Sequence, residues 1–199
     1  TMLADYAAPL ELDFVQPPSH TAAALTQLLP DTATVTNPLD YTTPIWGDYE
    51  RTLPVFKCLL EDGYDSAVLI QDYPSAGLDE SKPYYRADSD SFIKACQAAS
   101  IPAAICSTLP ENLDAETRGH ILQAGIAPMQ GIETCMQAIS AAVHYGKKRA
   151  ALLANSLQPF STAPLMDGNF RQLDEASAKT ILARAAMSVP SAYQLKMPE

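Results

Sequence analysis

The sequence has few basic residues and no long apolar run. Lys and Arg number 13 against 23 Asp and Glu, which gives a formal net charge of -10 at pH 7. Phosphate groups repel such a chain, so general binding to nucleic acid or to an anionic membrane is unfavourable. No apolar run approaches the roughly 20 residues that cross a bilayer, and no signal peptide is visible. We expect a soluble cytoplasmic protein.

Clustered cysteines and glycine-rich phosphate loops are also absent. The four cysteines, Cys58, Cys96, Cys106 and Cys135, are far apart in the sequence, without C-x-x-C or Cys/His ligand spacing. This pattern is typical of reduced core residues and predicts neither a disulfide framework nor a metal site. No G-x-G-x-x-G or G-K-[ST] motif occurs, and no hydroxyl- and glycine-rich loop of an FMN-binding flavodoxin.

What the chain does have is a core and an alternation of strands and helices. Its composition is 47% hydrophobic and 18% charged, as in globular proteins. Apolar runs predict strands at Leu10–Val15, Ala33–Thr36, Ala67–Gln71, Pro102–Cys106 and Ile126–Met129. Helical spacing predicts helices at Met2–Ala8, Ser19–Leu29 (capped by Ser19), Asp48–Glu61, Ala87–Ala99, Asp114–Ala124 and Glu133–Leu153. Alternation of this kind favours an α/β fold with a doubly wound, mostly parallel sheet of about five strands, with one more strand expected before Met2.

Composition changes near residue 155. Residues 1–154 form the predicted domain, and residues 155–171 have the Pro, Ser and Gly content of a linker. Residues 172–199 hold one more helix, Ala176–Ala186, which is too short to form a core alone.

The polar turn after Ala33–Thr36 is the strongest candidate site. It reads Asn37-Pro38-Leu39-Asp40-Tyr41-Thr42-Thr43 and precedes a helix. Open α/β sheets bind ligands where a strand runs into such a turn. From spacing alone, the more common explanation is that Asn37 and Asp40 only cap the turn through hydrogen bonds from side chain to backbone.

Other polar residues have simpler explanations. His20 is expected to be exposed, and His120 and His144 to be surface or core residues without a partner at catalytic spacing. Asp88 and Asp90 resemble a paired-carboxylate site, but they are expected where a helix starts, so capping and the helix dipole explain them equally well. Residues 72–86 are predicted to form a long loop. Within it, Tyr84-Tyr85-Arg86 would form either a binding patch or ordinary loop packing. Trp46 would anchor the turn after Asp40 or another domain.

Several stretches, in order, resemble the ADP-forming acyl-CoA synthetases, relatives of succinyl-CoA synthetase with several domains in one chain. They are Asn37-Pro38-Leu39-Asp40 with the helix after it, the strand Ala67–Gln71, Ala124–Pro128 with the helix from Glu133, and the pattern from Leu173-Asp174-Glu175 to Val189-Pro190, which resembles the entry to an ATP-grasp domain. Each motif alone is weak, but the ordered set covers nearly the whole chain.

The resemblance implies a flavodoxin-like CoA-ligase domain, truncated at its N-terminus, followed by the start of an ATP-grasp module. In that family a carboxylate, ATP and CoA give acyl-CoA, ADP and phosphate, and a histidine carries the phosphoryl group. Helix N-termini from two flavodoxin-like domains face this phosphohistidine. Thr1, Asn37, Asp40, Thr42 and Thr43 would then be phosphate-facing or ligand-turn residues.

The same resemblance places the chemistry elsewhere in the enzyme. The chain would contain no catalytic residue, metal ligand or cofactor of its own, and would be inactive alone. ATP, Mg and CoA would bind the full enzyme, in which the CoA-binding, phosphohistidine and ATP-grasp domains are the partners. The chain would therefore be part of an acid-thiol ligase.

The chain departs from the family pattern in several places, one of which is the missing glycine before Val189-Pro190, where the chain reads Ala186-Met187-Ser188. Ser19-His20-Thr21-Ala22 is similar to the phosphorylated Ser-His-Thr-Gly motif, but Ala22 replaces the glycine and the segment fits an ordinary helix start. Glycines expected soon after Asn-Pro-x-Asp are replaced by Tyr41-Thr42-Thr43.

Two alternatives are a catalytically silent regulatory module of a protein acetyltransferase, and a dimerisation domain that uses the apolar face of Glu133–Leu153.

Overall fold

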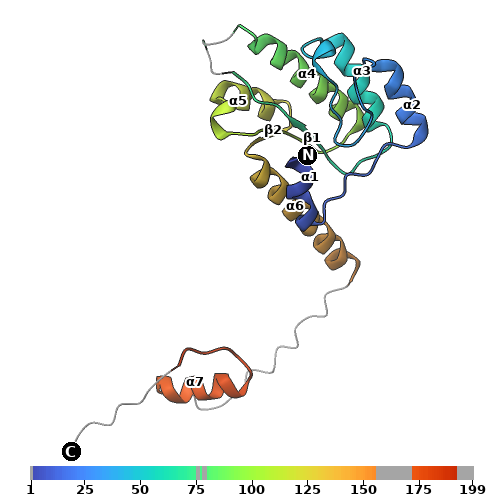
Figure 1. The fold of residues 1–199 in the computed structure, drawn as a ribbon. Coiled ribbons are helices and arrows are strands. Elements are labelled where there is room, and N and C mark those ends of the chain that lie inside the picture. The colour runs from blue at the N-terminus through green and yellow to red at the C-terminus, as the bar shows by residue number, and fades with distance from the viewer. Residues whose placement is uncertain (1, 75–76, 78–79, 156–171, 192–199) are drawn as a thin grey trace, which may run out of the picture. The chain divides into compact units, whose positions relative to one another are not determined.

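The computed structural model describes residues 2–74, 77, 80–155 and 172–191 (Figure 1). The chain divides into two compact units, Thr1–Asn155 and Ser156–Glu199. The expected linker, apart from Asn155, lies outside the described residues. None of the described helices is both long and apolar enough to cross a bilayer.

The first unit is built on a parallel sheet. Its strands are β1 (Ala67–Ile70), β2 (Ala103–Ser107) and β3 (Ala127–Gln130), in that spatial order. Leu69 pairs with Ile105, which pairs with Pro128. The predicted parallel sheet is confirmed, and the fold is α/β of the flavodoxin-like type. The described residues contain three strands, fewer than the five expected.

Helices cover both faces of this sheet. They are α1 (Met2–Ala7), α2 (Ser19–Leu28), α3 (Tyr49–Leu60), α4 (Lys82–Ala99), α5 (Ala115–Gln123) and α6 (Ile132–Ala154), with 3-10 turns at Ala8–Leu10, Thr43–Ile45 and Pro110–Asn112. Asp48 and Asp114 cap α3 and α5 by accepting backbone N–H bonds. Gly63 and Gly125, with φ of 78° and 80°, follow the ends of the same two helices.

The side chains of the strands pack in two of the three core clusters, and the third cluster joins α2 to α3. Ala67 and Leu69 pack in the cluster that holds Phe56 of α3 and Phe92 of α4. Val68 and Ile70 pack in the cluster that holds residues of α1 and α6, such as Ala7, Ile132 and Met136. Because successive side chains of a strand point to opposite faces, the sheet is buried on both sides and is doubly wound.

Two predicted strands are absent, which is a correction. Leu10–Val15 and Ala33–Thr36 belong to no sheet. In the first, Leu12 and Phe14 do pack on the α1/α6 cluster, but the carbonyl of Val15 accepts hydrogen bonds from side chains. In the second, Thr34 and Thr36 are exposed. Alternation and β-branched residues indicate an extended backbone but do not supply a partner strand.

Two helix starts also differ from the prediction. Helix α2 has no side-chain cap. Its N-cap position is Pro18, and Ser19, the predicted cap, is the first residue of the helix. Helix α4 begins at Lys82 rather than at Ala87, with a proline in its first turn, which suits a helix start. The predicted long loop 72–86 is therefore partly helical.

The second unit contains α7 (Glu175–Arg184). The side chain of Asp174 accepts the N–H of Ser177 and caps the helix, as the Leu173-Asp174-Glu175 start predicted. No residue of this helix is buried within the described structure.

Candidate functional site

The predicted turn is held in place at its start by Asn37. Its side-chain amide donates to the carbonyl of Val15 at 3.0 Å, and its backbone N–H and carbonyl bond to the side chain of Gln16 at 2.9 and 2.7 Å. Asp40 accepts the N–H of Thr42 at 2.9 Å, which closes an Asx turn. These contacts agree with the interpretation that both side chains shape the turn.

Thr42 combines two unusual features. Its φ of 65° and ψ of 155° lie in a region that is essentially restricted to glycine. Its hydroxyl is buried and has no hydrogen-bond partner in the part of the chain that the structure describes. Thr43 is exposed and begins a 3-10 turn, and Thr1 lies outside the described residues. Thr42 is therefore the candidate whose geometry local turn chemistry does not explain.

Asp88 of α4 holds the turn in place through hydrogen bonds. This carboxylate is fully buried on α4 and accepts the hydroxyl of Tyr41 and the N–H of Gly47, both at 2.8 Å. Burial raises the pKa of Asp88, and burial next to this carboxyl group raises the pKa of Tyr41. The prediction that Asp88 caps a helix start is wrong, because it lies inside α4 and bonds across the fold.

Aromatic packing closes the far end of the turn. The ring of Trp46 lies 4.7 Å from that of Tyr85 and 5.9 Å from that of Tyr84, measured between centroids. Gly47 has φ of 77°, and a Cβ there would meet the Cβ of Tyr84 at 2.6 Å. The two tyrosines thus lie in a helix and fix the turn, so they are packing residues and not a patch on a loop.

A second polar group lies at the carboxyl ends of β1 and β2. Asp72 accepts the N–H and hydroxyl of Thr108 at 2.8 and 2.6 Å, and the amide of Asn112 at 3.0 Å. Burial opposes ionisation of Asp72, but these hydrogen bonds outweigh it and lower its pKa. Beside it, the side chains of Gln71 and Ser107 are buried and have no partner among the described residues.

Sequence reasoning did not find this group, because it looked for a ligand turn only after Ala33–Thr36, which forms no strand. The carboxyl edge of a parallel sheet is the usual ligand position in such folds. The signal was present: polar residues directly follow two apolar runs, at Gln71-Asp72 and Ser107-Thr108. Buried polar atoms are normally hydrogen-bonded, so those of Gln71 and Ser107 mark this edge for water or ligand.

Each of the three histidines has a neighbour that accounts for it. His120 lies 2.6 Å from Asp90, which also pairs with Arg86 at 3.5 Å, so the expectation that His120 lacks a partner is wrong. Asp90 is accordingly an ion-pairing residue within α4 rather than a cap. His20 is exposed, as predicted, and lies 3.0 Å from Asp62. The ring of His144 contacts the carbonyl of Ser140 at 2.9 Å.

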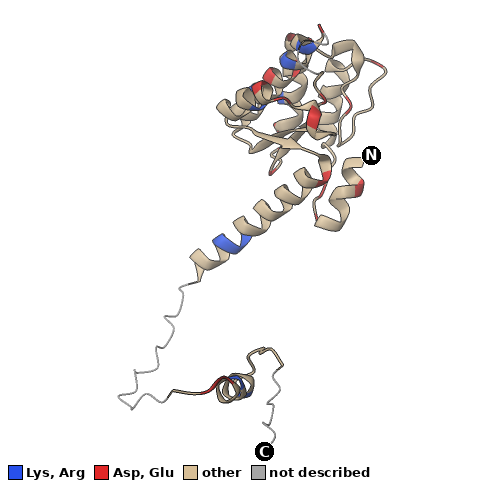
Figure 2. Ribbon diagram, turned by 90° about the vertical axis from the view of Figure 1, so that its left-hand side faces the viewer, with Lys and Arg blue, Asp and Glu red and all other residues tan. Residues whose placement is uncertain are grey.

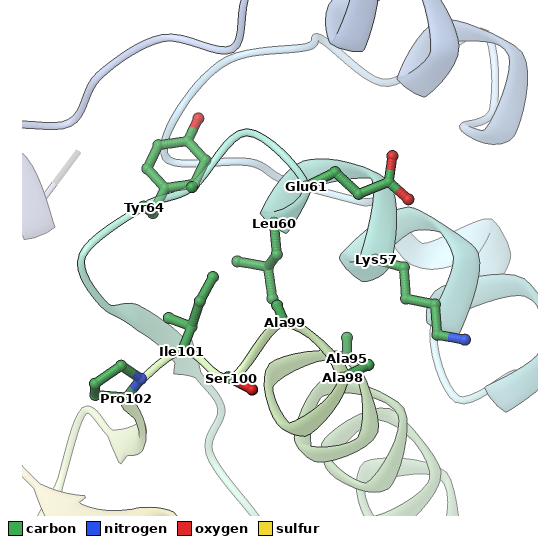
Figure 3. Close-up of a pocket in the computed structure, with 11 residues that line it drawn as sticks. Lys57, Leu60, Glu61, Tyr64, Ala95, Ala98, Ala99, Ser100, Ile101 and Pro102 are labelled. Atoms are coloured by element: carbon green, nitrogen blue, oxygen red, sulfur yellow. The ribbon is translucent and has the colours of Figure 1, made fainter.

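A pocket of about 570 Å³ lies beside the amino ends of β1 and β2, near the C-terminal ends of α3 and α4 (Figure 3). Its wall includes three alanines of α4 with Leu60, Ile101 and Pro102, and only Lys57 and Glu61 bring charge. No group of three metal-ligating side chains occurs in the described residues. This pocket has no set of groups for catalysis.

The comparisons with known proteins support the fold. No protein-family model and no curated protein matches the sequence. The structure is similar to the crystal structure of PH0766 from Pyrococcus horikoshii OT3, with a TM-score of 0.59 and 21% sequence identity. The similarity covers 73% of this chain and 33% of that one, so the matched part spans about a third of PH0766. The α/β class of this chain is thus shared with an archaeal protein of known structure.

Proposed function

We propose that this chain is the flavodoxin-like unit of an ADP-forming acyl-CoA synthetase, followed by the start of an ATP-grasp module. The ordered set of family-like motifs carries the proposal. In the fold these motifs lie in segments that connect elements. Asn37-Pro38-Leu39-Asp40 forms the first part of the turn of residues 37–43, called here the Thr42 turn, and Ala124–Pro128 connects α5 to β3. The Leu173-Asp174-Glu175 motif is the capped start of α7.

The proposed role is support of phosphoryl transfer in a larger cytoplasmic enzyme. Free N–H groups at a helix start stabilise a phosphoryl group, and in the family a helix of this unit faces the phosphohistidine. Within this chain, the Thr42 turn has the buried polar atom and the constrained backbone that suit a contact with ligand or with a neighbouring domain.

The chemical groups of the reaction would come from other domains. No described cluster fits a metal ion, and no glycine-rich phosphate loop occurs in the sequence. His20 has Asp62 as its partner, and Ala22 stands where the phosphohistidine motif has glycine. We therefore assign ATP, Mg and CoA to the full enzyme and expect no turnover by this chain alone.

The test compares the chain with the full-length polypeptide that contains it. Each is incubated with ATP, Mg, CoA and a panel of carboxylic acids, and acyl-CoA and nucleotide products are separated. The full-length protein should form acyl-CoA and ADP. Formation of AMP, or thioester synthesis by the 199-residue chain, would overturn the proposal.

A substitution in the full-length protein tests the turn itself. Asp40→Ala removes the acceptor for the N–H of Thr42. If the turn contacts ligand, acyl-CoA formation falls while the melting temperature is unchanged. If activity and melting temperature fall together, the residue only shapes the turn. Thr32→Ala, at an exposed position outside the turn, is the control.

One observation favours a second candidate, the silent regulatory module. The family often has glycines soon after Asn-Pro-x-Asp, and here Thr42 occupies a glycine-like conformation with its hydroxyl buried. A threonine side chain blocks the close backbone approach that glycine allows. A full-length protein without thioester synthesis but with a fused acetyltransferase domain would decide for this candidate.

A further inference from the structure

Two cysteines that are far apart in the sequence meet in the fold. Cys106 belongs to β2, and Cys135 belongs to the first turn of α6. Both are 0% exposed and lie in the core cluster between the sheet and α6. The thiol of Cys135 donates a hydrogen bond to the sulfur of Cys106. Cys58 and Cys96, by contrast, lie in helices α3 and α4 on the opposite face of the sheet.

Backbone hydrogen bonds between β2 and α6 hold this pair in place. The N–H of Gly131, the residue before α6, donates to the carbonyl of Ser107 at 2.9 Å, and the N–H of Cys135 donates to the carbonyl of Gly131 at 3.0 Å. In its thiol form Cys106 donates to the carbonyl of Ser107 at 3.3 Å. Figure 1 and Figure 2 both show α6 starting against the sheet. The first turn of the helix is therefore fixed to the strand that carries Cys106.

The two thiols differ in how easily they ionise. Hydrogen bonds from the S–H of Cys135 and the N–H of Gly131 lower the pKa of Cys106. Burial and the nearby carboxylate of Asp72 oppose this effect, but the hydrogen bonds outweigh them. The same sulfur–sulfur bond, together with burial, raises the pKa of Cys135. The basic residues of α6, 147–149, begin about 18 Å further along the helix (Figure 2), so the helix start and not a cation of α6 favours the Cys106 thiolate.

We propose that Cys106 and Cys135 form a redox-active dithiol, which closes to a disulfide when hydrogen peroxide oxidises it. The thiolate of Cys106 attacks one oxygen of the peroxide, the O–O bond breaks, and Cys106 becomes a sulfenic acid while the other oxygen leaves as water. The sulfur of Cys135 then attacks that of Cys106, which forms the S–S bond and releases the second oxygen as water. The two thiols give up two electrons and two protons, and the peroxide accepts both.

Burial of the pair selects a small oxidant. Gly131, beside Cys106, and Thr108, which follows the last residue of β2, are both only partly buried. Hydrogen peroxide is close to water in size, so a brief local opening at the start of α6 admits it, whereas a bulky aromatic disulfide needs a much larger opening. We therefore expect peroxide to oxidise the pair in native protein. This property goes beyond the proposed ligase role and does not depend on it.

Counting thiols in the reduced Cys58→Ser variant tests the proposal. This variant lacks the one cysteine that is not fully buried and keeps three others. After native treatment with hydrogen peroxide and removal of the oxidant, unfolding in urea should reveal one thiol, that of Cys96, and dithiothreitol should restore three. Three thiols that persist after peroxide, or a loss that dithiothreitol does not reverse, would overturn the proposal.

Further substitutions in the Cys58→Ser background identify the bond and the role of each sulfur. Cys135→Ala should leave Cys106 sensitive to peroxide, with a sulfenic acid that dimedone labels after unfolding, whereas Cys106→Ala should leave Cys135 unreacted. Cys96→Ala replaces an equally buried cysteine on the other face of the sheet and is the matched control. Only the proposed pair then remains, so a disulfide-linked peptide should still form. Its absence in that variant would contradict the pairing.

Melting temperature gives a second readout on the same Cys58→Ser protein. A disulfide between Cys106 and Cys135 closes a loop of about 30 residues and lowers the entropy of the unfolded chain. The oxidised protein should therefore melt about 5 °C or more above the reduced protein, and dithiothreitol should reverse the shift. A lower melting temperature after oxidation would show that the bond forms only in a distorted chain and would count against a native pair.

Discussion

Thr42 holds a backbone conformation in which a side chain is costly. A residue in this region costs about 1–3 kcal/mol and persists only where its surroundings enforce it. Here the surroundings are visible: Asp40 accepts the N–H of Thr42, and Tyr41, the residue directly before Thr42, donates its hydroxyl to Asp88. The local hydrogen bonds outweigh the preference of one residue.

Replacing Thr42 by glycine should therefore stabilise the protein. Relief of strain and removal of the unpartnered hydroxyl exceed the entropic cost of glycine, which leaves a net gain of about 1 kcal/mol in the free energy of unfolding. Urea denaturation measures it. Thr43→Gly should instead cost about 0.5–1 kcal/mol, because Thr43 has no such conformation. A loss at Thr42 as large as that at Thr43 would contradict the argument.

Asp88 should give the folding free energy a defined pH dependence. Burial raises its pKa in the folded protein above the unfolded value. The folded state then binds a proton more tightly than the unfolded chain, so stability falls as pH rises from below about 4 through the folded pKa. Asp88→Asn keeps an acceptor for Gly47 and has no titration. The unfolding free energy of the wild type minus that of this variant should decrease between about pH 4 and pH 7.

The matched variant separates charge from hydrogen bonding. Asp88→Ala removes both acceptor oxygens and leaves the N–H of Gly47 and the hydroxyl of Tyr41 without their partner. We expect a loss of about 2–3 kcal/mol near pH 4 that becomes smaller toward pH 7, because this variant also lacks the titrating group. If the stability curves of the wild type and of the Asp88→Asn variant run parallel in pH, Asp88 does not titrate differently in the fold.

Between elements, Asp114 links α5 to the start of α4. Its side chain accepts the N–H of Thr117, and Lys82 donates to it at 2.6 Å. Burial opposes ionisation, but the bonds from Lys82 and Thr117 prevail and lower the pKa of Asp114 to about 2. One carboxylate therefore caps one helix and orients another.

Asp114→Ala should cost about 1–2 kcal/mol of unfolding free energy at pH 7. Asp114→Asn keeps the cap but loses the charge and should cost less. Because the folded pKa lies below the unfolded value, the carboxylate stabilises above about pH 4 and its contribution is lost as pH falls toward 2. Thermal melts of the three proteins across this range measure the effect. A wild-type advantage over the Asp114→Asn variant that grows at low pH would contradict the assignment.

The elements differ in how far sequence alone predicts them. β1, α3 and α5 were predictable because a continuous apolar run or a capping aspartate is a local signal. Ala33–Thr36 was not, because a strand needs a neighbour that its own residues do not specify. The start of α4 was missed because tertiary packing of Tyr85 on Trp46 and Tyr73 lies beyond local pattern. The bond from Tyr41 to Asp88 joins residues 47 positions apart, so the anchor of the site was hidden for the same reason.

At the scale of the whole first unit, burial of apolar side chains on each face of the sheet explains the layers of helices on both sides. β1 and β2 are apolar on both faces, so helices must cover both. The polar groups that matter lie where these layers end, at the Thr42 turn and at the carboxyl ends of β1 and β2. Helix α6 is the exception, since half of it leaves the layers.

The reactivity of the four cysteines measures how completely the helices cover the sheet. Cys96 in α4, Cys106 in β2 and Cys135 in α6 are each at most 1% exposed and occupy the three successive layers, whereas Cys58 in α3 is partly exposed. In native protein, dithionitrobenzoate should therefore modify one thiol, and in urea all four. Burial, with Glu61 and Asp62 nearby, raises the pKa of Cys58, so its reaction should be slow at pH 7 and accelerate as pH rises past about 9. Cys58→Ser should abolish the native reaction and leave three thiols in urea. Rapid native modification of a second thiol would show that the helices do not close over both faces of the sheet.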